Sequence, residues 1–105
     1  MALPNSRVGL APGLRRLIRA GARERLGWIR ENLQYAMDAT DQDAALIHAL
    51  AGVSAGTVRN FLRGTDSSLG NVLLIAEALG ISVGDLERPP GEFRQLLRER
   101  LGTDG

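Results

Sequence analysis

The sequence DAALIHALAGVSAGTVRNFLRG, residues 43–64, predicts two short helices joined by a tight turn. Gly52 follows a run of helix-forming residues, and a glycine in the left-handed conformation commonly ends a helix. Ser54 comes two residues later, at the expected N-cap of the second helix, where its hydroxyl can accept a hydrogen bond from a backbone N–H. Gly64 is expected to end the second helix. We therefore predict one helix on each side of a three-residue turn.

The second of these helices has an apolar side and a polar side. Val58, Phe61 and Leu62 recur at helical spacing and can pack on a matching apolar stripe in the first helix. The opposite side has two arginines, an asparagine and no acid, and consists of Gly56, Arg59, Asn60 and Arg63. A short rigid helix with such a side suits the major groove of DNA.

Together with SLGNVLLIAEALGISVGDL, residues 68–86, this stretch resembles the helix-turn-helix domain of lambda-repressor-like regulators of the Cro/cI or XRE type. The resemblance extends over about residues 22–86. The sequence differs from the family pattern at three positions, where it has Ala44 for a common glutamine, His48 for a small residue and Ser67 for a common proline.

The resemblance implies a five-helix domain that binds double-stranded DNA and regulates transcription. The second helix of the motif and its N-cap would supply Ser54, Ala55, Gly56, Thr57, Arg59, Asn60 and Arg63. In this family the start of the preceding helix and the loop after the motif also contact phosphates, which points to Gln42, Ala44, Thr65, Ser68 and Asn71.

The chemistry of these side chains agrees with such contacts. Asn60 can form two hydrogen bonds with adenine, while Arg59 or Arg63 can pair with guanine or hold a phosphate. The small residues before them would let the helix tip approach the groove closely, and Thr57 can offer its methyl or hydroxyl group to a base. Taken singly, each charged side chain could also belong to a solvated helix face.

The composition limits the other possibilities. A chain of 105 residues is expected to form one domain, and without an alternating strand pattern the predicted class is all-α. The absence of cysteine suits a reducing cytoplasm, where the protein would associate with the nucleoid when bound to DNA. No stretch approaches the ~20 apolar residues of a membrane span.

The residue patterns also argue against catalysis. We find no phosphate-binding loop, metal-ligand cluster or catalytic constellation, so we predict no enzyme activity, cofactor, metal or small-molecule effector. The single histidine, His48, is expected to pack between the two helices of the motif, with pH sensing as the alternative.

Charge is unevenly distributed along the sequence, although the net charge is only +1. Residues 1–30 hold seven arginines and one acidic residue, Glu24, whereas residues 64–87 hold four acidic residues and no basic one. A basic beginning and a basic second helix on an acidic body would orient the protein on a polyanion.

The N-terminal region is predicted to begin with a flexible basic arm over residues 1–13, which contain two prolines and two glycines. Because Gly21 interrupts the following helical pattern, we separate a short helix at 14–20 from a longer one at 22–37, with one continuous helix as the alternative. The arginines here either contact DNA or lie on a solvated face. Those that could contact DNA are Arg7, Arg15, Arg16 and Arg19.

Beyond the motif, residues 69–79 are apolar nearly all round and predict a central buried helix that begins after Ser68. Ser82 and Asp85 have the spacing of a capping box, which predicts a further short helix. That helix would stop before the two prolines at 89 and 90.

A last helix is predicted over about residues 91–101, with an apolar face made by Phe93, Leu96, Leu97 and Leu101. This face could pack on its own domain or form a dimer seam. The apolar side of residues 14–18 is a second candidate seam, and we favour the first. One recognition helix offers few base-reading side chains, so we expect a homodimer on a nearly palindromic site, with half-site centres about 34–36 Å apart.

The predicted organisation is an arm at 1–13, a DNA-binding domain at 14–88 and a C-terminal helix and tail at 89–105. The expected function is sequence-specific DNA binding by a minimal, Cro-like or phage-type transcriptional regulator. Two alternatives remain open. One is a DNA-binding antitoxin that also holds a toxin, and the other is a protein-interaction module that has lost DNA binding.

Overall fold

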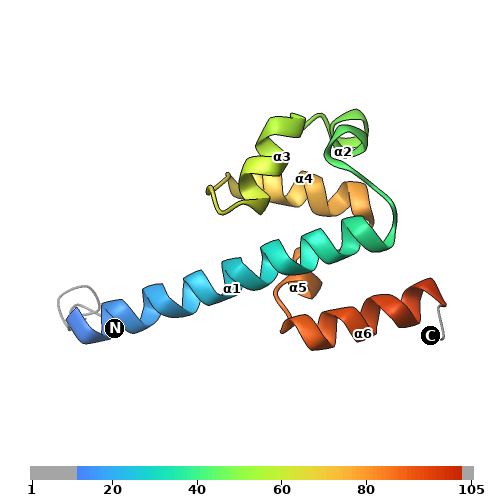
Figure 1. Cartoon of the computed structure of the whole chain (residues 1–105). Coiled ribbons are helices and arrows are strands. Elements are labelled where there is room, and N and C mark those ends of the chain that lie inside the picture. Colours follow the sequence, from blue (N-terminus) through green and yellow to red (C-terminus); the bar gives the residue numbers. More distant parts are fainter. Residues whose placement is uncertain (1–11, 103–105) are drawn as a thin grey trace, which may run out of the picture.

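The computed structural model describes residues 12–102, which form six helices (Figure 1). In chain order these are α1 (Pro12–Ala39), α2 (Ala44–Ala51), α3 (Ala55–Leu62), α4 (Leu69–Leu79), α5 (Val83–Leu86) and α6 (Pro90–Leu101). No strand occurs between residues 12 and 102, so the predicted all-α class is confirmed for this range. None of these helices is both long and apolar enough to cross a membrane.

α1 is one continuous helix, so the predicted break at Gly21 is wrong and the single-helix alternative is correct. Its neighbours in the sequence are mostly alanine, arginine and leucine, which favour helix, and an interior glycine costs only about 1 kcal/mol. A break would instead leave the backbone groups of two additional helix ends without partners. The last two residues of the predicted arm belong to α1, and residues 1–11, including Arg7, lie outside the described range.

The second half of α1 lies between two groups of helices (Figure 1). In this view α2, α3 and α4 are on one side of it, and α5 and α6 are on the other. The first half extends beyond both groups, and every side chain from residue 13 to residue 20 is exposed. The core receives apolar residues from all six helices, and its largest members are Phe61, Phe93, Leu33, Ile47, Ile75 and Leu86.

The turn between α2 and α3 has the predicted form. Gly52 has a φ of 76°, in the left-handed region, and its N–H donates to the carbonyl of His48 at 2.8 Å. Ser54 caps α3, because its Oγ accepts from the N–H of Thr57 at 3.1 Å. The left-handed glycine therefore redirects the chain within three residues, and α3 begins immediately after the turn.

α4 has the predicted bounds, but the prediction that it is a central buried helix is wrong in part. Val72, Ile75 and Ala76 are buried, whereas Leu69, Leu73 and Leu74 are 68%, 49% and 46% exposed. Because helices pack against α4 on one side only, its remaining apolar residues lie at the surface. α4 thus contributes both to the core and to the exposed apolar surface.

α6 packs along α1, and this corrects the predicted dimer seam. Phe93 and Leu97 are 1% and 5% exposed within the single chain, and the ring of Phe93 meets that of Tyr35 edge to face at 6.5 Å. Leu96 is half-buried, and only Leu101 is exposed. The alternative prediction, that the face packs on its own domain, is therefore correct for Phe93 and Leu97, which are unavailable to a partner.

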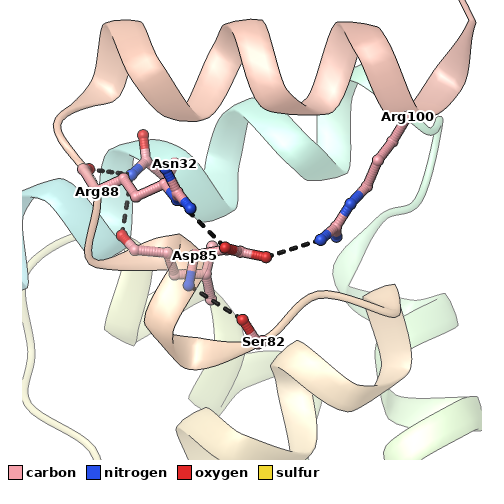
Figure 2. Close-up of polar contacts among 6 residues, drawn as sticks. Asn32, Ser82, Asp85, Arg88 and Arg100 are labelled. Atoms are coloured by element: carbon pink, nitrogen blue, oxygen red, sulfur yellow. Dashed lines mark hydrogen bonds and ion pairs between the residues drawn. The ribbon is translucent and has the colours of Figure 1, made fainter.

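A polar network joins α1, α5 and α6 (Figure 2). Asn32 of α1 is fully buried, and its Nδ2 donates to the carbonyls of Leu86 and Arg88 at 2.9 and 2.8 Å. Asp85 lies between Arg88 and Arg100, with contacts of 3.2 and 2.9 Å. This network fixes the link between α5 and α6, and therefore the position of α6 on α1.

The pKa of Asp85 reflects opposing effects. Burial raises the pKa, since its side chain is only 15% exposed, but hydrogen bonds from Arg88, Ser82 and Arg100 and the charge of Arg100 lower it. The hydrogen bonds and the charge outweigh the burial, so the pKa lies below its ordinary value. Ser82 also caps α5, because its Oγ accepts from the N–H of Asp85 at 3.1 Å.

Candidate nucleic-acid interface

The polar side of α3 faces solvent. Gly56, Arg59, Asn60 and Arg63 are all exposed, whereas Val58 and Phe61 on the opposite side are 0% and 1% exposed. Among residues 12–102, neither of the two arginines forms an ion pair or a side-chain hydrogen bond. The apolar anchors therefore hold α3 in place while its basic side remains open to a ligand.

Both ends of α3 are held by side chains, the first by its own N-cap and the second by a residue of α1. At the N-terminal end Ser54 caps the helix and also donates from its Oγ to the Oγ1 of Thr57 at 2.7 Å. Thr57 is half-buried, so its hydroxyl is partly used within the protein. Thr57 can still offer its hydroxyl hydrogen and its methyl group to a ligand.

At the C-terminal end of α3, Arg30 of α1 binds the last turn. Its Nε donates to the carbonyl of Phe61 at 2.7 Å, and one Nη donates to the carbonyl of Gly64 and to Asp66, both at 3.1 Å. The guanidinium also lies 5.0 Å from the centre of the Phe61 ring. A cation at a helix C-terminus satisfies free carbonyls and stabilises the helix dipole.

This role of Arg30 was not predicted from the sequence, in which the side chain is one of seven arginines of the basic N-terminal region. A signal was present, since Arg30 directly follows the core residue Ile29 and lies on the edge of the apolar stripe of α1. Asn32 was missed in the same way. It is three residues after Ile29 and therefore lies on the core side of the helix.

The predicted phosphate contacts around α3 differ in accessibility. Thr65 and Ser68 are exposed, Asn71 and Gln42 are half-buried, and the side chain of Ala44 is buried. Ser68 Oγ accepts from the N–H of Asn71, while the amide of Asn71 donates to Ser67 at 3.1 Å. These two side chains therefore cap and brace the start of α4, and this limits what they can offer to a ligand.

Gln42, Ala44 and Arg59 line a hollow of about 400 Å³ beside α3. Its rim also carries three aspartates, Asp38, Asp41 and Asp43. Asp43 caps α2, because its Oδ1 accepts from the N–H of Leu46 at 2.9 Å. The carboxylates make the surroundings of Arg59 more acidic than the sequence pattern of the motif suggested.

His48 does not pack between the two helices, because its side chain is exposed on α2. That prediction is wrong, since Ile47 and not His48 fills the space against the core. Within the described residues no group of three histidine, cysteine or acidic side chains is arranged to hold a metal ion.

The remaining arginines predicted to contact DNA lie on the extended first half of α1. Arg15, Arg16 and Arg19 are exposed there, away from the core, and Arg7 is outside the described range.

Comparisons with protein-family models, with curated proteins and with solved structures found no match to this chain.

Proposed function

We propose that this protein is a sequence-specific DNA-binding regulator of transcription, with α3 as the recognition helix of a helix-turn-helix motif formed by α2 and α3. One observation carries the proposal. α3 is held at both ends and along its apolar side, yet its exposed side presents Arg59, Asn60 and Arg63 with no internal ion pairs. A fixed helix with free hydrogen-bond donors is the element that reads base edges in the major groove.

The surroundings of the two arginines favour different roles for them. Arg59 lies beside Asp38, Asp41 and Asp43, whose negative charges disfavour a phosphate at that position. Arg59 is therefore better suited to a guanine edge than to a phosphate. Arg63, at the C-terminal end of α3, does not line this acidic hollow and is suited to a phosphate.

Asn60 is the second proposed base-reading side chain. It is exposed on the same side of α3, and its amide can donate to and accept from the edge of an adenine. Gly56, one turn earlier, is also exposed and has no side chain that would keep α3 from the floor of the groove. The exposed Thr65 and Ser68 in the loop before α4 are proposed to contact the phosphate backbone.

A second candidate function is protein binding, either alone or alongside DNA binding as in an antitoxin. It is favoured by exposed leucines on α2 and α4, which are Leu46, Leu50, Leu73 and Leu74. Leu50 and Leu74 line a shallow hollow between these helices. Exposed apolar patches of this kind commonly mark interaction surfaces. A protein that co-purifies stoichiometrically with the chain would support this candidate.

Selection of bound sequences from a random DNA pool tests the favoured function. We expect one enriched motif, and titrations should then separate Asn60→Ala from Arg63→Ala. Loss of Asn60 should relax the preference at one base position by about 1–3 kcal/mol. Loss of Arg63 should weaken binding to all DNA sequences by the same factor. Failure to enrich any sequence, with both variants binding like the wild type, would contradict the proposal.

A further inference from the structure

Three arginines in the first half of α1 share one side of the helix with Arg30. They are Arg16, Arg19 and Arg23, here called the α1 ridge. They precede Arg30 by about four, three and two turns, because an α-helix has 3.6 residues per turn. Arg25 points to a different side, where it lines a groove between α1, α4 and α5.

The contacts of Arg30 show what this side of α1 faces. The guanidinium of Arg30 donates to the carbonyls of Phe61 and Gly64 at 2.7 and 3.1 Å, so this side faces the C-terminal end of α3. The first half of α1 extends past the loop that follows α3 (Figure 1). The α1 ridge therefore continues from the end of α3, where Arg63 and Thr65 are exposed.

The α1 ridge has no partner within the described part of the chain. All three of its arginines are exposed, and among residues 12–102 none of them forms an ion pair. Glu24 is the single acid from residue 12 to residue 30, and it is six residues before Arg30, which places it on another side of the helix. The ridge is thus a row of positive charges without a counter-charge.

The surface beyond α3 has the opposite charge. Along α1, the ridge precedes the contact with α3, whereas Asp38 lies at the end of the helix and Asp41 and Asp43 follow it. These three carboxylates line the hollow beside Arg59 and disfavour a phosphate there. The charges around α3 therefore direct a polyanion toward the α1 ridge and away from the start of α2.

We infer that the α1 ridge binds the phosphate backbone of DNA next to the base pairs that α3 reads. The inference rests on the proposed function, because α3 is what brings the DNA beside α1. Contacts with phosphates position a protein on the duplex and carry no direct sequence information. The ridge would therefore add affinity for any DNA sequence, while the exposed side of α3 supplies the specificity.

The length of the α1 ridge limits the DNA that it can cover. Arg16 is fourteen residues before Arg30, or about 21 Å along the helix. One DNA strand has a phosphate about every 3.4 Å along the duplex axis, so the ridge can follow at most about six nucleotides of a strand. This extension corresponds to roughly half a turn of DNA beside the bases read by α3.

The first test measures DNA binding of the full-length protein at increasing salt concentration, on the DNA selected by the wild type and on unrelated DNA. Arg23→Ala should weaken binding to both by the same factor and make the plot of log affinity against log salt shallower by about 1. Arg19→Ala/Arg23→Ala should change this slope by about 2. Arg23→Lys keeps the positive charge and should keep the wild-type slope.

Arg25→Ala is the matched control for Arg23→Ala. It removes the same charge two residues away from an equally exposed position, but from a different side of α1, so it should bind with the wild-type slope. Equal losses in the two variants would overturn the inference, since only net charge would then matter. Wild-type binding by Arg19→Ala/Arg23→Ala, with Arg63→Ala still weakened, would overturn the inference and leave the proposed function intact. A wild type that enriches no DNA sequence would instead contradict the proposed function itself.

The second test maps the protected DNA backbone by hydroxyl-radical cleavage. The wild type should protect up to about six nucleotides beside the selected motif. Arg19→Ala/Arg23→Ala should lose this protection and keep the protection over the motif. Identical footprints for the two proteins would contradict the inference. Binding to vesicles of anionic phospholipid that is lost in Arg19→Ala/Arg23→Ala, together with an unchanged DNA footprint, would assign the ridge to a membrane surface instead.

Discussion

α3 and α6 are both amphipathic helices with arginines on their outer sides, but they use these arginines differently. In α6, Arg94 pairs with Glu31 at 3.1 Å and lies 5.1 Å from the ring of Tyr35, while Arg100 pairs with Asp85 at 2.9 Å. In α3, neither Arg59 nor Arg63 has such a partner among the described residues. The same residue type therefore attaches one helix to the protein and leaves the other available to a ligand.

The difference follows from what surrounds each helix. α6 packs against α1 near Glu31, and the α5 turn brings Asp85 within reach, so its arginines find acids on both sides. α3 is attached to the core by Val58 and Phe61 on its apolar side and by Arg30 at its C-terminal end. Its own arginines are therefore not needed to hold it in place. Charged side chains that lack an ion-pair partner within the protein therefore distinguish a binding surface from a structural one.

The largest expected effect comes from removing the anchor of α6. Phe93→Ala should lower the free energy of unfolding by about 3–5 kcal/mol, because it empties a fully buried aromatic site. Chemical denaturation measures this loss. Arg63→Ala is the comparison from α3 and should leave stability nearly unchanged. A Phe93→Ala protein as stable as the wild type would show that α6 does not belong to the core.

Gly52→Val should have the next largest effect on stability, and DNA binding should be lost with it. A residue with a side chain at a φ of 76° costs about 1–2 kcal/mol, and a β-branched residue is strained further. Gly27→Ala is the control, since Gly27 lies inside α1 with open space around it and alanine favours helix. A thermal melt of Gly52→Val that matches the wild type would show that the turn does not need its left-handed residue.

Arg30→Ala tests whether α3 is positioned from its C-terminal end. We expect a loss of about 1–2 kcal/mol in unfolding free energy, since the carbonyls of Phe61 and Gly64 lose a charged donor. DNA affinity should fall as well, because the last turn of α3 is no longer held. Arg23→Ala removes the same charge from an exposed site on α1 and should leave the thermal melt unchanged. Equal melting temperatures for the two variants would contradict this role of Arg30.

The smallest expected effect is the pH dependence contributed by Asp85. Its pKa is lowered in the folded protein, so its ion pairs stabilise the fold at neutral pH and are lost as the pH falls below about 4. The difference in melting temperature between the wild type and Asp85→Asn should therefore be present at pH 7 and shrink at pH 3. A constant difference for Asp85→Asn would mean that the carboxylate carries no pH-linked stabilisation.

Local features of the fold were predictable from the sequence because short-range chemistry determines them. Gly52 and Ser54 were placed correctly because a left-handed glycine and a capping serine act within a few residues. The bounds of α4 followed for the same reason. Gly21 misled the prediction, since the helix-forming residues around it outweigh one unfavourable residue.

Features that depend on distant parts of the chain were not predictable. Arg30 and Asn32 looked like ordinary polar residues of a long helix, and their partners are more than 30 residues away. The acids beside Arg59 come from the last turn of α1 and from the α1–α2 connection, which no helical pattern relates to α3. Similarly, an apolar stripe does not reveal its partner. The face with Phe93 and Leu97 was left open between its own domain and a dimer seam, and it was favoured as a seam over residues 14–18, yet Leu14 and Ile18 proved to be the exposed ones.

The most direct measurement compares two double variants in DNA binding at increasing salt concentration. Arg59→Ala/Arg63→Ala and Arg94→Ala/Arg100→Ala each remove two positive charges, the first pair from α3 and the second from α6. We expect a large loss of affinity for the α3 variant. Its plot of log affinity against log salt should also be shallower by up to about 2, less to the extent that Arg59 contacts a base and not a phosphate. The α6 variant should bind with a wild-type slope at a temperature where it is folded. Equal losses for the two variants would show that only net charge matters, and DNA binding unaffected by the α3 variant would contradict the assignment of α3 as the recognition helix.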